Sequence, residues 1–500
     1  MRIANEAYRS KVMSADEAAA LIPNGAKIGF AGFTGSGYPK EVPVALANRI
    51  KAEREKGQDF KISAFTGAST APELDGELAA TDGMEFRTPY QSDPILRNKI
   101  NEGVTYYTDI HLSHLHNQMA YGFFGGLDVA VIEASAITEE GVVPSSSVGM
   151  NRTYLEMADK IIIEVNSWQS EGLYGMHDIY YDIAVMPPNR RALPINKPSD
   201  RIGDKVYKID PAKVIAIVET SDPDRNSPFK PLDEDSKKIA GYLLDFFESE
   251  IKAGRLEENL APLQSGVGNI ANAVLAGLLD SKYENMTSYT EVIQDGMVDL
   301  LDSGKLTVAS ATAFSLSPEY AAKMNDNASE YAKKIILRPQ DVSNSPEAIR
   351  RMGVIACNGM IEADIYGNVN STHVMGSRMM NGIGGSGDFT RNSRFSCFVS
   401  PSTAKGGAIS AIVPMVNHVD HTEHDVSVII TEQGLADLRG LAPRQRAKKV
   451  IENCAHPDYR PLLEEYVERA AKKANGMHTP HDLSTALSWH VKFLEDGSMK

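Results

Sequence analysis

Short apolar runs alternate with segments of helical periodicity along the first 220 residues. The run at 26–31 is followed by a glycine-rich stretch, Gly32–Gly37, and then by helical spacing from residue 40 to 51. A mostly helical segment over residues 1–24 precedes them. Further runs of the same kind predict buried strands at 60–66, 129–133, 160–165 and 213–217. Near-continuous apolar strands separated by helices are typical of a mostly parallel sheet with helices on both faces.

A linker is predicted at residues 221–232, because Ser221–Pro231 carries three prolines and little apolar content. It divides the chain into an N-terminal domain, 1–220, and a C-terminal domain, 233–500. Helices are predicted in the second part over 236–256 and 269–279 and from Pro443 and Pro461 onward, strands over 306–313 and 408–413, and loops over 374–388 and 417–425.

The second half repeats motifs of the first at a spacing of about 230 residues. Gly35-Ser-Gly37 is matched by Gly266-Val-Gly268, and Ile132-Glu-Ala by Ile361-Glu-Ala. The run 61–67 is matched by 285–291, so that Glu291 stands where the first half has Gly67. The run 160–165 is matched by 427–432 once an insertion is allowed. The repeat predicts an α/β fold of two tandem, similar domains with mostly parallel sheets.

Composition and charge exclude several classes of function. The formal net charge of -15 argues against nucleic acid as a general partner, because phosphate binding needs a basic surface. No apolar stretch is long enough to predict a membrane span, and the amino terminus lacks a secretory pattern. Three cysteines in 500 residues make no disulfide framework. We therefore expect a cytoplasmic protein with buried free thiols.

Two acids follow predicted strands of the C-terminal domain, Glu291 and Glu432. Ligands of open parallel sheets bind at the carboxyl ends of strands, so this pair is a candidate catalyst and orienting partner. The helix dipole alone also favours an acid in a first helical turn. From the residues alone, Glu291 is therefore either a nucleophile or a helix-start acid, and Glu432 either a partner or a helix cap.

Other motifs are weaker indications of a catalytic or binding site. The patterns beginning at Gly266 and Gly382 match dinucleotide fingerprints formally. The first follows a polar loop rather than an apolar strand, and the residues after the second do not predict a helix start, so neither has the strand–turn–helix setting of such a site. The histidines at 111–116 and 418–424 lack the spacing of a helical zinc motif, so no metal site is expected. Ser145–Ser147 falls in a predicted polar turn, and the cysteines lack flanking motifs of a thiol nucleophile.

Three long motifs resemble the acetyl-CoA hydrolase/transferase family of class I CoA-transferases. They are Thr290–Gly296, Asn381–Phe389 and Ile430–Arg439, and the similarity covers nearly the whole chain. The resemblance implies the CoA-transferase fold with an active site between the domains, a homodimer, short carboxylates as co-substrates, and a place in acetate metabolism and the tricarboxylic acid cycle. It implies no permanently bound cofactor, with coenzyme A acting as a substrate.

The implied reaction moves CoA from succinyl-CoA to acetate by ping-pong kinetics through a glutamyl-CoA thioester on Glu291. Backbone amides of Val267 and Gly385 correspond to the family's oxyanion donors, and Asn344 and Glu432 to the residues that hold the glutamate. Residues matching the family's CoA contacts are Arg225, the loop Gly266, Val267, Gly268 and Asn269, Gly385 and Lys405, although Lys405 also fits a plain surface role. An acyl-CoA hydrolase of the same family and a non-catalytic CoA-binding module stay open as alternatives.

Overall fold

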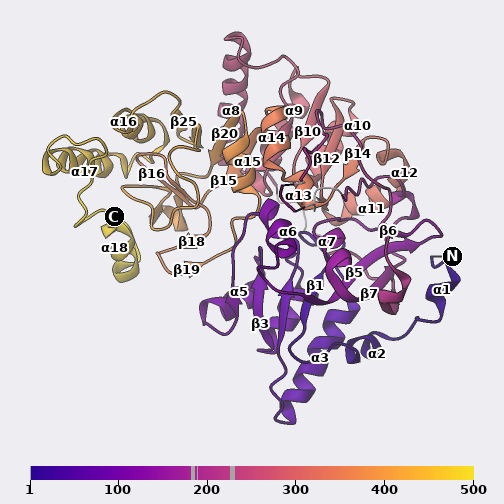
Figure 1. The fold of residues 1–500 in the computed structure, drawn as a ribbon. Helices are drawn as coiled ribbons and strands as arrows, with labels where there is room; N and C mark the ends of the chain where they lie inside the picture. The colour runs from indigo at the N-terminus through magenta and orange to yellow at the C-terminus, as the bar shows by residue number, and fades with distance from the viewer. Residues whose placement is uncertain (1, 182–185, 189, 226–230) are drawn as a thin grey trace. The chain divides into compact units, whose positions relative to one another are not determined.

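The protein is described by a computed structural model over residues 2–181, 186–188, 190–225 and 231–500 (Figure 1). Its residues pack into two compact units. Unit 1 comprises Met1–Phe229, Thr287–Asp302 and Leu306–Met352, and unit 2 comprises Lys230–Met286, Ser303–Lys305 and Gly353–Lys500. Residues 287–302 and 306–352 thus cluster with the N-terminal half. Compactness and sequence repetition are different criteria, so the boundaries at 1–220, 221–232 and 233–500 remain a prediction.

The first sheet of unit 1 has the strand order β4-β3-β2-β1-β5-β7-β8, with every pair on this path parallel and β6 antiparallel to β5. Its strands are β1 (Lys27–Phe30), β2 (Ile62–Phe65), β3 (Met84–Thr88), β4 (Tyr106–Tyr107), β5 (Leu127–Ile137), β6 (Val142–Pro144), β7 (Ala158–Asn166) and β8 (Val214–Thr220). The accompanying helices are α1 (Glu6–Arg9), α2 (Ala15–Ala20), α3 (Glu41–Glu55), α4 (Glu77–Ala80), α5 (Pro94–Asn101), α6 (Leu112–Ala120) and α7 (Asn151–Met157).

Helices cover both faces of this sheet, as the apolar runs predict. Ile28 and Phe30 of β1 point to one face and join the core formed with α2 and α3. Gly29 points to the other face, where a Cβ would lie 2.5 Å from the ring of Tyr154 on α7. Since successive residues of a strand face opposite sides, α3 and α7 lie on opposite faces (Figure 1).

The rest of unit 1 comes from the second half of the chain. Its strands follow the order β14-β12-β10, and β11 pairs in parallel with β13. The elements are β10 (Met286–Tyr289), β11 (Val292–Gln294), α10 (Asp295–Asp302), β12 (Leu306–Ala311), β13 (Ala313–Ser315), α11 (Pro318–Asp326), α12 (Ala328–Tyr331), β14 (Ile335–Leu337), α13 (Gln340–Ser343) and α14 (Pro346–Met352).

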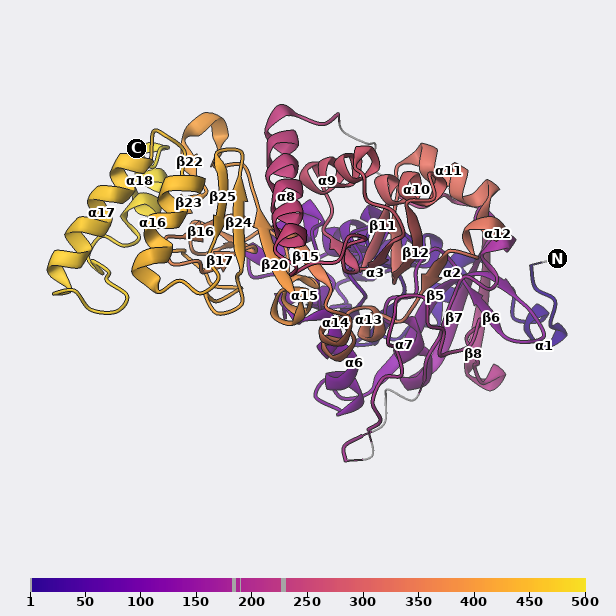
Figure 2. The same cartoon turned by 90° about the horizontal axis from the view of Figure 1, so that it is seen from above.

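Unit 2 has strands in the order β9-β15-β20-β24-β25, parallel except for the last pair. Helices α8 and α9 lie side by side, as do α16 and α17 (Figure 2). Its elements are α8 (Glu234–Lys252), β9 (Leu263–Ser265), α9 (Asn269–Asp280), β15 (Ile355–Gly359), β16 (Glu362–Asp364), β17 (Val369–Asn370), β18 (His373–Val374), β19 (Arg378–Met379), α15 (Ser386–Asn392), β20 (Phe395–Val399), β21 (Thr403–Ala404), β22 (Ile409–Ser410), β23 (Ile412–Val413), β24 (Val428–Thr431), β25 (Gly434–Asp437), α16 (Pro443–Cys454), α17 (Arg460–Lys473) and α18 (Ser488–Asp496).

The strand orders support the repeat seen in the sequence, except for the match of 160–165 with 427–432, because those runs are β7 and β24 and the counterpart of β24 is β8. The run β14-β12-β10 corresponds in chain order to β4-β3-β2, and the run β9-β15-β20-β24 to β1-β5-β7-β8. The predicted α/β class with mostly parallel sheets is confirmed.

Two of the alternatives left open and two local expectations were wrong. Glu291 is followed by strand β11 and the helix begins only at Asp295, so Glu291 is not a helix-start acid. Glu432 leads into strand β25, so it caps no helix. A strand, β9, does precede the loop at Gly266, and a helix, α15, does follow the glycines at 382–385. Three-residue strands and seven-residue helices carry too few side chains to show a clear period.

A buried ion cluster joins the glycine-rich loop of unit 1 to the start of the predicted linker. The Lys40 ammonium lies 2.5 Å from a carboxylate oxygen of Glu133 and 3.0 Å from one of Asp224. Asp224 also accepts hydrogen bonds from Gly37 N–H, Ser146 Oγ and Gln169 Nε2. All three charged residues are buried. Removing one partner of such a cluster leaves an uncompensated buried charge.

We therefore expect Lys40→Met to lower the free energy of unfolding by about 3–5 kcal/mol. Chemical denaturation at neutral pH measures this change. Lys51→Met removes an exposed lysine from α3, the helix that begins directly after Lys40. The Glu77 carboxylate is 3.3 Å from the Lys51 ammonium, and the change is expected to cost less than about 1 kcal/mol. Equal losses in the two variants would contradict a structural role for the cluster.

Candidate active site

Glu291 lies at a break between two short strands of unit 1, after β10 and before β11. Its carbonyl oxygen accepts a hydrogen bond of 2.8 Å from Thr312 N–H, at the similar break between β12 and β13. The partly buried Glu291 side chain is thus carried by well-anchored backbone.

The side-chain amide of Asn344 holds the Glu291 carboxylate. Asn344 Nδ2 donates to Glu291 Oε1 over 2.7 Å. The hydroxyl of Ser343 donates to Asn344 Oδ1 over 2.8 Å. An amide carries its acceptor on one side and its donors on the other, so the Ser343 contact directs the Asn344 NH₂ group toward the glutamate.

The short helix α13, which ends at Asn344, is fastened from several sides. The Tyr289 hydroxyl donates to the Val342 carbonyl oxygen over 2.5 Å. Arg152 Nη2 donates to Asp341 Oδ2 over 2.8 Å, and both side chains are buried. A four-residue helix is not stable by itself, so these contacts fix the place of Asn344.

An apolar cluster surrounds the backbone next to the acid. Phe33, Ala68, Leu112, Val292 and Ala313 form it, with the partly buried Tyr90 packed against them. Burial raises the pKa of Tyr90 to about 12, and the negative charge of Glu291 contributes to the rise. Low polarity around Glu291 strengthens its electrostatic interactions relative to those in water.

Arg225 belongs to unit 1 and follows the buried Asp224. Its backbone N–H donates to the Gly35 carbonyl oxygen over 2.9 Å. A Cβ on Gly35 would lie 2.2 Å from the Arg225 carbonyl oxygen, so the close approach requires glycine at this position. The guanidinium forms an ion pair with Glu73.

In unit 2, Glu432 fixes the loop after β20. One carboxylate oxygen accepts from Ser402 N–H over 2.7 Å, and the other accepts from the Ser402 hydroxyl and from Gln433 Nε2. Burial by itself would raise the pKa of Glu432, but these hydrogen bonds outweigh it and the pKa is lowered. Glu432 is therefore an ionised, firmly held acid.

Two backbone amides of unit 2 have no acceptor. In the part of the chain that the structure describes, the N–H groups of Val267 and Gly385 donate no hydrogen bond. Val267 lies between Gly266 and Gly268 in the loop that leads into α9, and its side chain is 62% exposed. Gly385 directly precedes α15. Amides in this state are available to an incoming acceptor.

Asn269 and Lys405, the other side chains predicted to contact CoA, have partners within the protein. Asn269 begins α9, and its Nδ2 lies 3.4 Å from an Asp233 carboxylate oxygen. Lys405 is exposed on the turn between β21 and β22, with its ammonium 5.0 Å from the ring centre of Phe493 on α18. This contact fits the plain surface role of Lys405 as well as a role in binding.

The structure thus brings Glu291 and Asn344 into direct contact within unit 1, which also holds Arg225. Val267, Gly385, Glu432 and Lys405 belong to unit 2. The residues that support Asn344 were not predicted from the sequence. They are Ser343, Tyr289 and the Arg152–Asp341 pair. Their residue types are ordinary, and contacts between distant segments leave no local motif.

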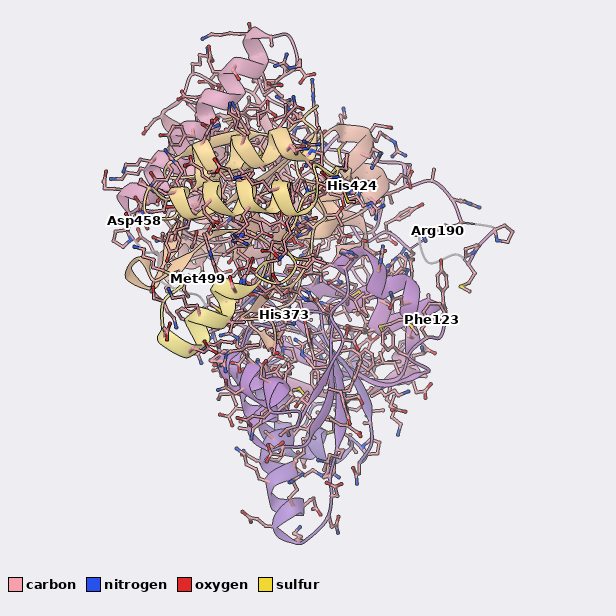
Figure 3. All side chains as sticks on the ribbon, turned by 90° about the vertical axis from the view of Figure 1, so that its left-hand side faces the viewer. Phe123, Arg190, His373, His424, Asp458 and Met499 are labelled. Carbon is pink, nitrogen blue, oxygen red and sulfur yellow. The ribbon has the colours of Figure 1, made fainter. Side chains whose placement is uncertain are left out.

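The cysteines form no disulfide among the described residues. Cys397 and Cys454 are buried free thiols, and Cys357 is partly buried. The His373 ring stacks on His418 at 3.9 Å, while His424 lies well apart from His373 (Figure 3). Across the described ranges, no group of three His, Cys, Asp or Glu side chains is arranged to hold a metal ion.

None of the helices described here is long and apolar enough to cross a membrane.

Known proteins resemble this chain over its whole length. Models of the acetyl-CoA hydrolase/transferase N-terminal and C-terminal domains match residues 1–219 and 321–467. Succinyl-CoA:acetate CoA-transferase of Clostridium kluyveri is 50% identical over 500 residues, covering 100% of this chain and 92% of that protein. Acetyl-CoA hydrolase of Eremothecium gossypii is 45% identical over 514 residues, covering 100% and 97%.

A solved structure shares the fold. RipA from Yersinia pestis matches with a TM-score of 0.72 and 24% identity, covering 94% of this chain and 99% of that one. The chain belongs to the acetyl-CoA hydrolase/transferase family, whose members act on CoA thioesters.

We expect Ser343→Ala to lower kcat on an acyl-CoA about fivefold, the equivalent of one hydrogen bond of about 1 kcal/mol. The Asn344 amide then loses the contact that sets its orientation, while KM for the acyl-CoA stays unchanged. Steady-state kinetics separate the two parameters.

Ser345→Ala is the matched control. Its hydroxyl accepts a hydrogen bond from Ala348 N–H at the start of α14, so its loss is expected to lower stability and leave kcat in place. Equal losses of kcat in both variants would show that Ser343 acts only through the fold.

Proposed function

We propose that the protein is a CoA-transferase that moves CoA from succinyl-CoA to acetate, with Glu291 as the nucleophile. The observation that carries the proposal is the hydrogen bond from Asn344 Nδ2 to Glu291 Oε1, 2.7 Å long. It joins two residues that the family resemblance assigns to catalysis and orientation. The likeness to the Clostridium kluyveri transferase supports the choice of substrates.

In the proposed reaction, a carboxylate oxygen of Glu291 attacks the thioester carbonyl of succinyl-CoA. The C–S bond breaks, CoA leaves as its thiolate, and a mixed anhydride of Glu291 and succinate forms. The thiolate then attacks the glutamyl carbonyl and releases succinate, leaving a glutamyl-CoA thioester. Acetate reverses these steps, so that acetyl-CoA leaves and the Glu291 carboxylate is restored. Each group is transferred by covalent catalysis with ping-pong kinetics.

Each tetrahedral intermediate carries a negative oxygen that needs donors. We assign the Val267 amide to the glutamyl carbonyl and the Gly385 amide to the acyl carbonyl of the substrate, following the family resemblance. The absence of an acceptor on either amide in the described chain supports this assignment. A donor of this kind lowers a barrier by roughly 3 kcal/mol.

We assign charged and polar side chains to the orientation of Glu291 and to the binding of CoA. Asn344 holds one oxygen of the proposed nucleophile, and we assign Glu432 to the support of this carboxylate during the reaction. Arg225 and, more weakly, Lys405 are assigned to the anionic groups of CoA, with the loop from Gly266 to Asn269. Binding of the distant CoA tail then contributes energy that positions the thioester.

Hydrolysis is the second candidate, because the relative from Eremothecium gossypii is an acetyl-CoA hydrolase at 45% identity. In that reaction water, rather than acetate, takes the acyl group or the glutamyl thioester. A CoA-binding module without catalysis is the third candidate, and a held carboxylate beside an orienting amide has no evident use in it.

The family resemblance also supports a homodimer in the cytoplasm, with a part in acetate metabolism and the tricarboxylic acid cycle. We include these in the proposal. Light scattering of the purified protein tests the dimer.

The dependence of turnover on acetate distinguishes transfer from hydrolysis. With succinyl-CoA as donor, we expect acetyl-CoA to form only when acetate is present. Double-reciprocal plots are then expected to be parallel, because succinate leaves before acetate reacts. Release of CoA thiol without acetate is expected to be far slower than transfer. Thiol release at equal rates with and without acetate would overturn the transferase proposal in favour of the hydrolase.

A further inference from the structure

A pocket of about 540 Å³ opens in unit 1 beside Arg225. Tyr38, Glu73, Trp168 and the segment 222–225 are among the residues that line it. Every one of these residues belongs to unit 1. The pocket therefore presents Arg225, assigned above to CoA, together with an acidic residue to which the proposed reaction gives no role.

Both residues of the Arg225–Glu73 ion pair make further contacts within unit 1. Arg225 follows Asp224, which is fixed by the buried ion cluster, and its N–H is bound to Gly35. Glu73 accepts a hydrogen bond of 3.0 Å from the hydroxyl of the buried Tyr38. The Arg225 guanidinium therefore meets a carboxylate that Tyr38 already holds in place.

The charges of the pocket are unfavourable for a simple anion. The Lys40 ammonium, at the pocket wall, is occupied by Glu133, Asp224 and the Tyr38 carbonyl oxygen. The Arg225 guanidinium, 58% exposed, already has the Glu73 carboxylate as its partner. Asp222 adds another negative charge to the lining.

A free carboxylate gains nothing by replacing Glu73 on Arg225. The two groups have the same charge and the same two oxygens, and Glu73, being part of the chain, is present at a high effective concentration. A phosphate group has up to two negative charges and three acceptor oxygens. It therefore forms a stronger, charge-assisted contact with the guanidinium than a carboxylate does.

We infer that Glu73 is a specificity-determining residue, an internal anion that reserves Arg225 for a phosphate group of the acyl-CoA and keeps free carboxylates off it. The inference rests on the proposed function, in which CoA binds at Arg225 and carboxylates are co-substrates. Without Glu73, the acceptor or product acid would compete with CoA for the same guanidinium.

The test is the affinity of the purified full-length protein for CoA, measured by titration calorimetry in chloride and in succinate at equal ionic strength. In chloride, Glu73→Gln is expected to bind CoA about two- to fivefold more tightly than wild type, as an exposed ion pair is worth up to about 1 kcal/mol. In succinate, that gain is expected to disappear. Succinate bound at the acyl site affects both proteins alike, so the difference between them is the readout.

A second ligand identifies the phosphate. A gain seen with CoA but not with 3′-dephospho-CoA assigns the 3′-phosphate, and a gain with both assigns the pyrophosphate. Either result supports the inference.

Two controls separate the possible failures. Glu77→Gln makes the same charge change at an exposed residue paired with Lys51. An equal gain in CoA affinity in this variant would show that the effect comes from the net charge of the protein, and would overturn the inference. Arg225→Ala is expected to weaken CoA binding. If it does so while Glu73→Gln behaves as wild type, the inference fails and the proposed function stands. If Arg225→Ala binds CoA as wild type does, the assignment of CoA to Arg225 fails as well.

Discussion

The hydrogen bond from Asn344 Nδ2 to Glu291 Oε1 holds one oxygen of the carboxylate that we propose as the nucleophile. The contact depends on layers of support within unit 1. Ser343 orients the amide, and Tyr289 and the Arg152–Asp341 pair secure the short helix that carries it. Because α13 is too short to be stable by itself, the geometry at Glu291 depends on buried polar contacts with distant segments.

The glycine-rich loop of the N-terminal half packs closely against its neighbours. A Cβ at Gly35 would meet the backbone of Arg225, and one at Gly37 would lie 2.3 Å from the Ser147 hydroxyl. Gly35 thus allows the loop to pack against Arg225, and Gly37 allows it to pack against Ser147. The buried cluster of Lys40, Glu133 and Asp224 then fixes the residue directly before Arg225. Close packing and buried charges together determine where the backbone of the exposed Arg225 lies.

The sequence predicted the architecture well because the buried strands have long apolar runs. The strands at 129–133 and 160–165 and the helix at 236–256 were found close to their observed positions. It failed at short elements, such as β9, β11 and α15, whose few residues show no period. The repeat marked Glu291 as an exception within a duplicated pattern, and the family motifs pointed to Asn344. Neither could show Ser343, Glu73 or Tyr38 as partners, since those contacts exist only once distant segments have folded together.

The most direct measurement of the central claim is the mass of the protein after rapid mixing with succinyl-CoA, acid quenching and peptide mapping. A covalent intermediate predicts a CoA adduct on the peptide that contains Glu291, lost again when acetate is added before the quench. The Glu291→Ala variant should form no adduct while it still binds CoA. A wild-type protein that turns over its substrate without a CoA adduct, or with an adduct at another residue, would contradict the assignment of Glu291 as the nucleophile.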